Sequence, residues 1–362
     1  MSFRLSGQSI VAMCAAFTVG GSAMASTINQ NTSWTIDRST ATTKYRVVAY
    51  GDSIYAGYNG GIGSVGRRAA PVVQGEYLAQ KWNTDIEVIR RTKSGAKADD
   101  IYNNKIVSER SYMQAATTRA VMFEMCGNDF LQARSAFTDQ SGTCSYAGLE
   151  SALAACTTYT ERAMQAINQY ATTAKVKIVS NIYYPGFAAD NVLTNCTDSA
   201  TGQKINKQTK FLPLLARSNW RTCNLAARYG FQCADSFAEM MGAEYDSNGD
   251  GQVDSDALRY RAGETEDAYV TRISSTLRGT LRDANTHFVN ASTSYDYIQS
   301  DNTHPTYLGS TISVSIFSGS GSGTGAPQFT DAQMPGGKNP DWNKNGHDKM
   351  GWESAKFNPA TP

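Results

Sequence analysis

The chain has 362 residues, of which 41% are hydrophobic and 18% are charged, a composition typical of a globular protein with a substantial core. Lysine plus arginine number 33 and aspartate plus glutamate number 32, and the absence of a basic run argues against a nucleic-acid partner. After residue 25, no uncharged apolar run reaches the roughly 18 residues of a membrane-spanning helix. We therefore expect no integral membrane association.

The first 25 residues have the pattern of a cleavable signal peptide. Arg4 supplies a positive charge, residues 10–19 form a short apolar stretch, and Ala-Met-Ala at 23–25 is a small-x-small cleavage site. The alternative is a buried N-terminal helix, but the polar run 27–33 is typical of a mature N-terminus. The sequence thus predicts a secreted or periplasmic protein, cleaved near Ala25.

Cysteine usage agrees with an oxidising compartment. Cys14 leaves with the signal peptide, and the even number that remains allows up to three disulfides. The sequence cannot choose among the pairings, although Cys144 with Cys156 and Cys196 with Cys223 would each close a polar insertion. The remaining cysteines are Cys126, Cys144, Cys156, Cys196, Cys223 and Cys233.

Short apolar runs that predict strands alternate with longer helical patterns. This alternation predicts one α/β domain of three layers, in which helices cover both faces of a doubly wound, mostly parallel, five-stranded sheet. The predicted strands are 45–50, 85–90, 120–125, 176–182 and 231–234, and the predicted helices are 75–82, 146–173 and 211–229.

The predicted domain spans residues 43–317 and carries insertions around its cysteines. Residues 26–42 form an N-terminal extension before it. Residues 318–327 alternate glycine with serine and threonine, a composition typical of a flexible linker. Residues 328–362 are a polar tail with too few apolar residues to fold alone.

Ser53 stands in the sequence Gly51-Asp52-Ser53-Ile54, directly after the first predicted strand. Ligands of open α/β sheets bind at the carboxyl ends of the strands, so a nucleophile is expected there. A serine in this position is also common as a helix N-cap, and the tripeptide alone does not decide between the two.

An activated serine needs a base that titrates near neutrality, and the chain has only three histidines. His304 has Asp301 three residues upstream, where the carboxylate can orient the imidazole. His287 lies in a stretch predicted to be helical, without an orienting acid, and His347 lies in the tail. These two are expected to be ordinary surface or packing histidines.

Acyl transfer also needs hydrogen-bond donors for the developing oxyanion. Ser94-Gly95-Ala96 follows the second predicted strand, and Gly127-Asn128-Asp129 follows the third. The first allows close approach of a backbone N–H and the second presents an amide side chain. The alternatives are a turn glycine and a helix N-cap.

Together these four segments resemble the sequence blocks of the SGNH hydrolases, the GDSL-type lipases and esterases, and they occur in family order from residue 47 to about residue 317. The resemblance implies a flavodoxin-like fold and a two-step acyl transfer that needs no cofactor. It implies that Ser53 is the nucleophile, His304 the base and later the acid, and Asp301 its orienting partner. The implied oxyanion donors are the backbone N–H groups of Ser53 and Gly95 and the side-chain amide of Asn128.

The leading hypothesis is a secreted serine esterase or lipase acting on a lipid acyl or glycan acetyl ester. An acyltransferase would use the same residues, and a calcium-dependent, non-catalytic surface or binding protein is a further alternative. Aromatic residues at 183–187 would line an acyl or sugar pocket, or simply pack. The sequence does not indicate an oligomeric state.

Residues 246–257 resemble an EF-hand or dockerin-type calcium loop. Position 12 of the loop is Ala257 instead of the usual acid, so Asp256 or another carboxylate must complete the ligand set. A structural calcium ion is expected, and a solvated acidic turn is the alternative. The expected ligands are Asp246, Asn248, Asp250, Gln252 and Asp254.

Overall fold

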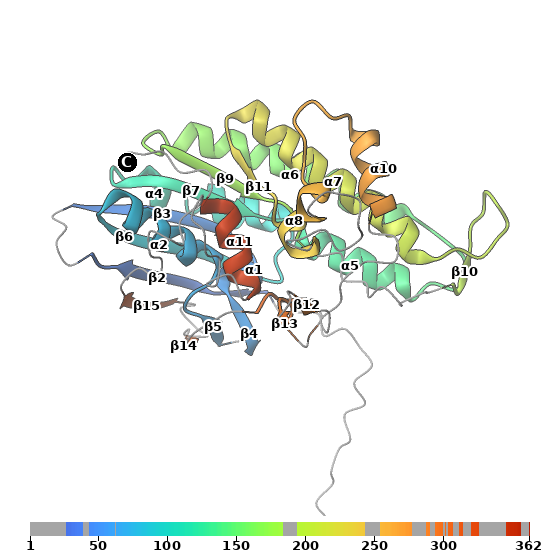
Figure 1. The fold of residues 1–362 in the computed structure, drawn as a ribbon, viewed down its shortest axis with the longest axis horizontal. Coiled ribbons are helices and arrows are strands. Elements are labelled where there is room, and N and C mark those ends of the chain that lie inside the picture. The colour runs from blue at the N-terminus through green and yellow to red at the C-terminus, as the bar shows by residue number, and fades with distance from the viewer. Residues whose placement is uncertain are drawn as a thin grey trace, which may run out of the picture.

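The computed structural model describes residues 27–38, 43–61, 63–183, 194–242, 254–276, 287–289, 294–299, 301, 303–306, 311–313, 320–325, 345–355 and 362. Their main feature is a sheet in the order β11-β9-β7-β3-β6-β2-β15, with β1 also paired to β6 (Figure 1). Its strands are β1 (Ile28–Asn29), β2 (Asn31–Ile36), β3 (Lys44–Gly51), β6 (Asp85–Ser94), β7 (Thr118–Glu124), β9 (Val176–Ser180), β11 (Gln232–Ala234) and β15 (Ser320–Gly325).

The five predicted strands are confirmed as neighbouring, parallel strands of this sheet. β3 pairs with both β6 and β7, β9 joins β7, and β11 joins β9, all in parallel. The first strand of the series therefore lies inside the sheet, between the second and the third. Val47, Val48 and Ala49 of β3 are all buried, because helices cover both faces of a parallel sheet.

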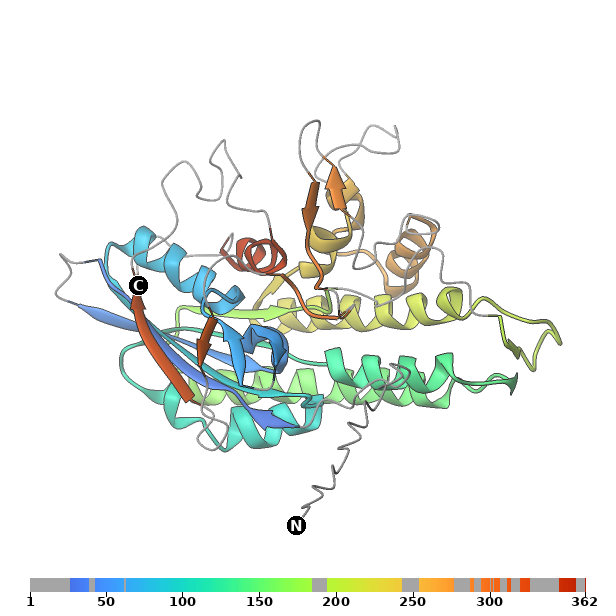
Figure 2. The same cartoon turned by 90° about the horizontal axis from the view of Figure 1, so that it is seen from below.

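Helices form a layer on each face of the sheet. Figure 2 shows α2 and α11 on one face and α6 on the other. The predicted helices are present as α2, α6 and α7, although α2 begins five residues earlier than predicted, with Pro71 in its first turn. The helices are α1 (Ser53–Ala56), α2 (Ala70–Trp82), α3 (Ala98–Asp100), the π-helical η1 (Ile101–Val107), α4 (Ser111–Gln114), α5 (Gly127–Thr138), α6 (Ala147–Tyr170), α7 (Lys207–Tyr229), α8 (Ser236–Met241), α9 (Asp254–Leu258), α10 (Glu266–Thr276) and α11 (Gly346–Ala355). None of those within the described residues is long and apolar enough to cross a membrane.

Two segments placed outside the domain from the sequence are strands of its sheet. In the predicted extension 26–42, β2 pairs antiparallel with β6 and buries Trp34 and Ile36. In the predicted linker 318–327, β15 pairs in parallel with β2 and places Gly323 opposite Trp34. A side chain at Gly323 would occupy the space of the Trp34 indole. Gly323 therefore serves packing, and because 320–325 is a strand of the sheet, the linker interpretation was wrong.

Part of the predicted polar tail is also integrated in the fold. Helix α11 packs between α2 and α8, and it buries ion pairs as well as the apolar side chain of Met350. Lys349 Nζ lies 3.0 Å from Glu239 Oε2, and Glu353 Oε1 lies 2.7 Å from Arg259 Nη1. Because each buried charge has an opposite partner, a polar segment can dock without leaving unpaired charges.

The disulfides differ from the two pairings favoured by the sequence. Cys144 is bonded to Cys196, and Cys223 to Cys233. The first bond joins the ends of two strands that pair in parallel, and the second joins α7 to β11. Cys126 and Cys156 are free and buried. The favoured pairings assumed that each insertion closes on itself, whereas Cys144–Cys196 connects two separate insertions.

Three small sheets complete the described strands. His287 begins one of them, so its assignment to a helical stretch was wrong. The sheets consist of β4 (Tyr58–Gly61), β5 (Ser64–Gly66) and β14 (Thr311–Ser313); β8 (Gly142–Thr143) and β10 (Cys196–Thr197); and β12 (His287–Val289) and β13 (Ser294–Asp296).

Candidate active site

Ser53 begins helix α1, two residues after the end of β3. Asp52 is the N-cap, and its Oδ1 accepts the Ile54 N–H at 2.8 Å. Because β3, the first strand of the parallel series, lies between the second (β6) and the third (β7), Ser53 is at the point where the strand order reverses. That point is where open α/β sheets form their ligand sites.

His304 lies between Ser53 and Asp301. Its Nε2 is 2.9 Å from Ser53 Oγ and its Nδ1 is 2.6 Å from Asp301 Oδ2. In this arrangement the imidazole can accept the serine proton through Nε2 while Nδ1–H donates to the carboxylate. The structure thus brings together the three residues that the sequence singled out from segments far apart in the chain.

Asp301 is held as an anion in a suitable orientation. Its Oδ1 accepts the backbone N–H groups of Thr303 and His304, both at 3.0 Å. Although burial raises the pKa of Asp301, the hydrogen bonds and charge of His304 outweigh burial and lower it below the ordinary value. The carboxylate therefore stays ionised and available to orient the imidazole.

The segment around His304 is fixed from several sides. The ring of Tyr58 lies against the imidazole, and Tyr183 donates its hydroxyl hydrogen to the carbonyl of Thr303. Thr306 accepts the His347 N–H through its carbonyl at 2.9 Å. His347, at the start of α11, is thus buried next to the segment that carries His304, and among the described residues it makes no hydrogen bond to Ser53.

Two of the three expected oxyanion donors, Gly95 and Asn128, come from two turns that meet beside Asp52. Gly95 has φ of 74°, a left-handed conformation that favours glycine. Asn128 joins the turns, since its Nδ2 donates to Asp52 Oδ2 at 2.8 Å and to the carbonyl of Ala96 at 3.0 Å. Both amide hydrogens are engaged in these two bonds, so donation to an oxyanion would replace the bond to Ala96.

Asp129 also joins the two turns through a hydrogen bond. Its Oδ2 accepts the backbone N–H of Ala98 at 2.9 Å, at the start of α3. Burial raises the pKa of Asp129 to about 6. It therefore supports the site structurally and makes its stability dependent on pH.

The comparison with protein families agrees with this geometry. The family model of the GDSL-like lipases and acylhydrolases matches residues 47–317. The chain belongs to this family. As a GDSL hydrolase of the SGNH superfamily, the protein is a serine ester hydrolase with the three-layer α/β fold expected from its sequence.

Several solved structures resemble the GDSL hydrolase at low sequence identity. The lipase Lip_vut3 from a goat rumen metagenome is 16% identical over 66% of this chain and 99% of its own, with a TM-score of 0.41. TesA is 14% identical over 65% of this chain and 99% of its own, with a TM-score of 0.34. AlinE4, an SGNH-hydrolase family esterase, is 15% identical over 66% of this chain and 95% of its own, with a TM-score of 0.35. No curated protein sequence matches the chain significantly.

Two residues of the site had no role in the sequence analysis. Tyr58 contacts His304, and Glu124 at the end of β7 accepts the Asp52 N–H at 2.6 Å. Nothing in the local sequence marks Tyr58. Glu124 does leave a signal, because a charged residue within an otherwise apolar strand is rarely buried without a specific partner.

Most of the predicted calcium ligands lie outside the described residues. Asp246, Asn248, Asp250 and Gln252 lie outside the described residues, and Asp254 is the first residue of α9. Among the residues that are described, no group of three or more His, Cys, Asp or Glu side chains is arranged to hold a metal ion. The calcium loop stays a prediction.

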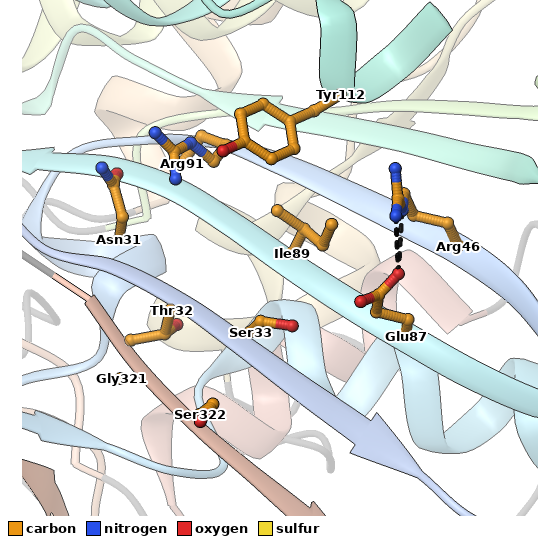
Figure 3. Close-up of a pocket in the computed structure, with 10 residues that line it drawn as sticks. All are labelled: Asn31, Thr32, Ser33, Arg46, Glu87, Ile89, Arg91, Tyr112, Gly321 and Ser322. Atoms are coloured by element: carbon orange, nitrogen blue, oxygen red, sulfur yellow. Dashed lines mark hydrogen bonds and ion pairs between the residues drawn. The ribbon is translucent and has the colours of Figure 1, made fainter. Parts of the chain in front are cut away.

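A hollow of about 400 Å³ lies over β2, β6 and β15 (Figure 3). Arg46 and Glu87 form an ion pair at 2.8 Å within it. Arg46 is near the amino end of β3, whereas Ser53 follows its carboxyl end, so the hollow is remote from the triad. Its lining residues are Asn31, Thr32, Ser33, Arg46, Glu87, Ile89, Arg91, Tyr112, Gly321 and Ser322, and these provide no nucleophile with a histidine base.

Proposed function

We propose that this serine hydrolase cleaves carboxylic esters through an acyl-enzyme on Ser53, with His304 as base and Asp301 as its orienting residue. The observation that carries the proposal is the position of one imidazole, within hydrogen-bond distance of both Ser53 Oγ and Asp301 Oδ2. Nucleophile, base and orienting acid are the three groups that this chemistry requires.

The proposed reaction has two steps. Ser53 Oγ attacks the ester carbonyl carbon and passes its proton to His304 Nε2. The tetrahedral intermediate then expels the alcohol, which takes that proton. Water next attacks the acyl-enzyme, again with His304 as base, and the carboxylic acid leaves as the Ser53 hydroxyl is restored.

The negative charge of the tetrahedral intermediate needs donors that are already in place. In the proposal these are the backbone N–H groups of Ser53 and Gly95 and the amide of Asn128. The Asn128 amide keeps its bond to Asp52 and exchanges its bond with Ala96 for one with the oxyanion. A donor of this kind contributes about 10²–10³ in rate.

The nucleophile is tested with a fluorophosphonate probe. Wild type should be labelled, whereas Ser53→Ala should lose both labelling and turnover. Ser236→Ala is the matched control, because Ser236 is buried and its hydroxyl has no hydrogen-bond partner among the described residues. Equal labelling of wild type and Ser53→Ala would refute the assignment.

The substrate class is tested with p-nitrophenyl esters from acetate to palmitate and with an acetylated oligosaccharide. A preference for long acyl chains supports a lipid ester, and a preference for acetate with release of glycan acetyl groups supports a glycan ester. Adding an alcohol acceptor measures acyl transfer. New ester formation in excess of hydrolysis would identify an acyltransferase.

We also propose that the protein is exported after cleavage near Ala25. The small-x-small pattern at 23–25 supports this, as do the bonds Cys144–Cys196 and Cys223–Cys233, since disulfides persist in oxidising compartments. Mass spectrometry of the protein secreted by its source cell should give a chain that begins at Ser26. An intact N-terminus would contradict the proposal.

A further inference from the structure

Two carboxyl groups are buried directly behind Ser53. The exposed fractions are 1% for Asp52 and 6% for Glu124. Glu124 Oε1 accepts the backbone N–H of Asp52 at 2.6 Å, and its carboxyl group fills the space that a side chain at Gly51 would need. The glycine of the Gly-Asp-Ser segment therefore makes room for Glu124.

The hydrogen bonds assign different protonation states to the two groups. Both oxygens of Asp52 accept hydrogens, Oδ1 from the Ile54 N–H and Oδ2 from the Asn128 amide, each at 2.8 Å. A further hydrogen bond joins the Asp52 and Glu124 carboxyl groups directly. Because ionised carboxylates only accept, this bond requires one proton between them.

The proton belongs on Glu124. Burial, and after it the charge of Asp52, raise the pKa of Glu124 well above its ordinary value. Burial raises the pKa of Asp52 as well, but the hydrogen bonds from Ile54 and Asn128 and the charge of His304 oppose burial, so Asp52 is the better anion of the two. The charge of Glu124 also acts on Tyr55 and Cys126, and the charge of His304 acts on Asp52.

We propose that Glu124 is a positioning residue for the ester hydrolysis: as a neutral acid it donates a hydrogen bond to Asp52 and so fixes the Asp52–Asn128 contact that orients the oxyanion donor. This inference rests on the proposed function of Ser53 and Asn128. It assigns Glu124 no contact with the substrate. Its effect should therefore appear in kcat, because the oxyanion develops only after substrate binding.

The test compares Glu124→Gln with Glu124→Ala. Glutamine keeps a donor toward Asp52 and an acceptor for its backbone N–H, so Glu124→Gln should retain kcat within about threefold. Alanine removes both, and kcat should fall about tenfold to hundredfold with little change in KM. This fall is smaller than the one expected when an oxyanion donor itself is removed. Equal kcat in both variants would overturn the inference.

The pH profile gives an independent measurement that does not need the alanine variant to fold. In wild type, loss of the Glu124 proton at high pH places two carboxylates side by side, and kcat should decline. Glu124→Gln cannot lose this proton, so its activity should extend to higher pH. The same alkaline limit in both proteins would overturn the inference. Ser53→Ala is measured in parallel, because activity in that variant refutes the proposed nucleophile and not the role of Glu124.

Discussion

The ring of Tyr58 lies against the imidazole of His304, with centroids 4.2 Å apart and planes inclined by 30°. Gln299 strengthens this contact, since its Nε2 donates to the Tyr58 carbonyl at 2.8 Å and its backbone N–H donates to the His304 carbonyl at 2.7 Å. The small sheet that carries Tyr58 and the segment that carries His304 are thereby joined. The contact restricts the rotation of the imidazole between Ser53 and Asp301.

Removal of the Tyr58 ring should therefore impair turnover. We expect Tyr58→Ala to lower kcat by about tenfold to hundredfold, because a small misplacement of the base is costly. Tyr58→Phe keeps the ring and should stay near wild type. Steady-state kinetics with p-nitrophenyl acetate measures both. A fully active Tyr58→Ala variant would show that the contact does not position the base.

The two other triad residues should differ in the size of their effects. His304→Ala should lower kcat/KM by about 10⁴ or more, and Asp301→Ala should lower it less, because the acid acts through the histidine. His287→Ala is the control and should remain active. Greater damage from His287→Ala than from His304→Ala would overturn the assignment of the base.

Calcium should stabilise the fold without taking part in acyl transfer. If it binds only the folded chain, calcium at about 100 times its dissociation constant adds about 2.7 kcal/mol to the free energy of unfolding. Tm should rise with calcium, fall with EDTA, and become insensitive to both in Asp250→Ala. A Tm unaffected by EDTA and calcium would remove the claim, and loss of turnover in folded Asp250→Ala would place the metal in the active site.

The sequence predicted the centre of the sheet and missed its edge for a physical reason. Strands such as β3 and β7 are buried on both faces and leave continuous apolar runs. β2 contributes only Trp34 and Ile36 to the core, and β15 contributes no apolar residue. Their pairing joins opposite ends of the chain, so no local pattern reveals it.

The residues of the site likewise fall into those that the sequence predicts and those that it does not. Ser53, Asn128 and His304 stand in short segments whose residue types indicate their chemistry, and the structure brings these segments together. The roles of Tyr58 and Glu124 depend on what lies beside them in space. Neither Tyr58 nor Glu124 belongs to a sequence motif, so the sequence does not show that one will contact His304 and the other Asp52.

The stability of the protein should depend on Asp129. Burial raises its pKa to about 6, so the folded chain binds this proton more tightly than the unfolded chain, whose aspartate titrates near pH 3.9. As pH rises from about 4 to above 6, the free energy of unfolding should fall, by on the order of 3 kcal/mol from this group. Asp129→Asn keeps an acceptor for Ala98 and removes the titration. Urea unfolding across this range should show a smaller decline in the variant, and parallel curves would contradict the assignment.

The contact between Trp34 and Gly323 should make the apparent linker sensitive to substitution. A methyl group at Gly323 would meet the Trp34 indole, which is itself buried between the strand and the guanidinium of Arg67 at 4.2 Å from its ring. We expect Gly323→Ala to lower the free energy of unfolding by about 1–3 kcal/mol, as overpacking does. Ser322→Ala is the control, because Ser322 is exposed and its change should stay within about 0.5 kcal/mol. In a flexible linker both substitutions would be neutral, so equal Tm values for the two variants and wild type would show that β15 does not contribute to the sheet in solution.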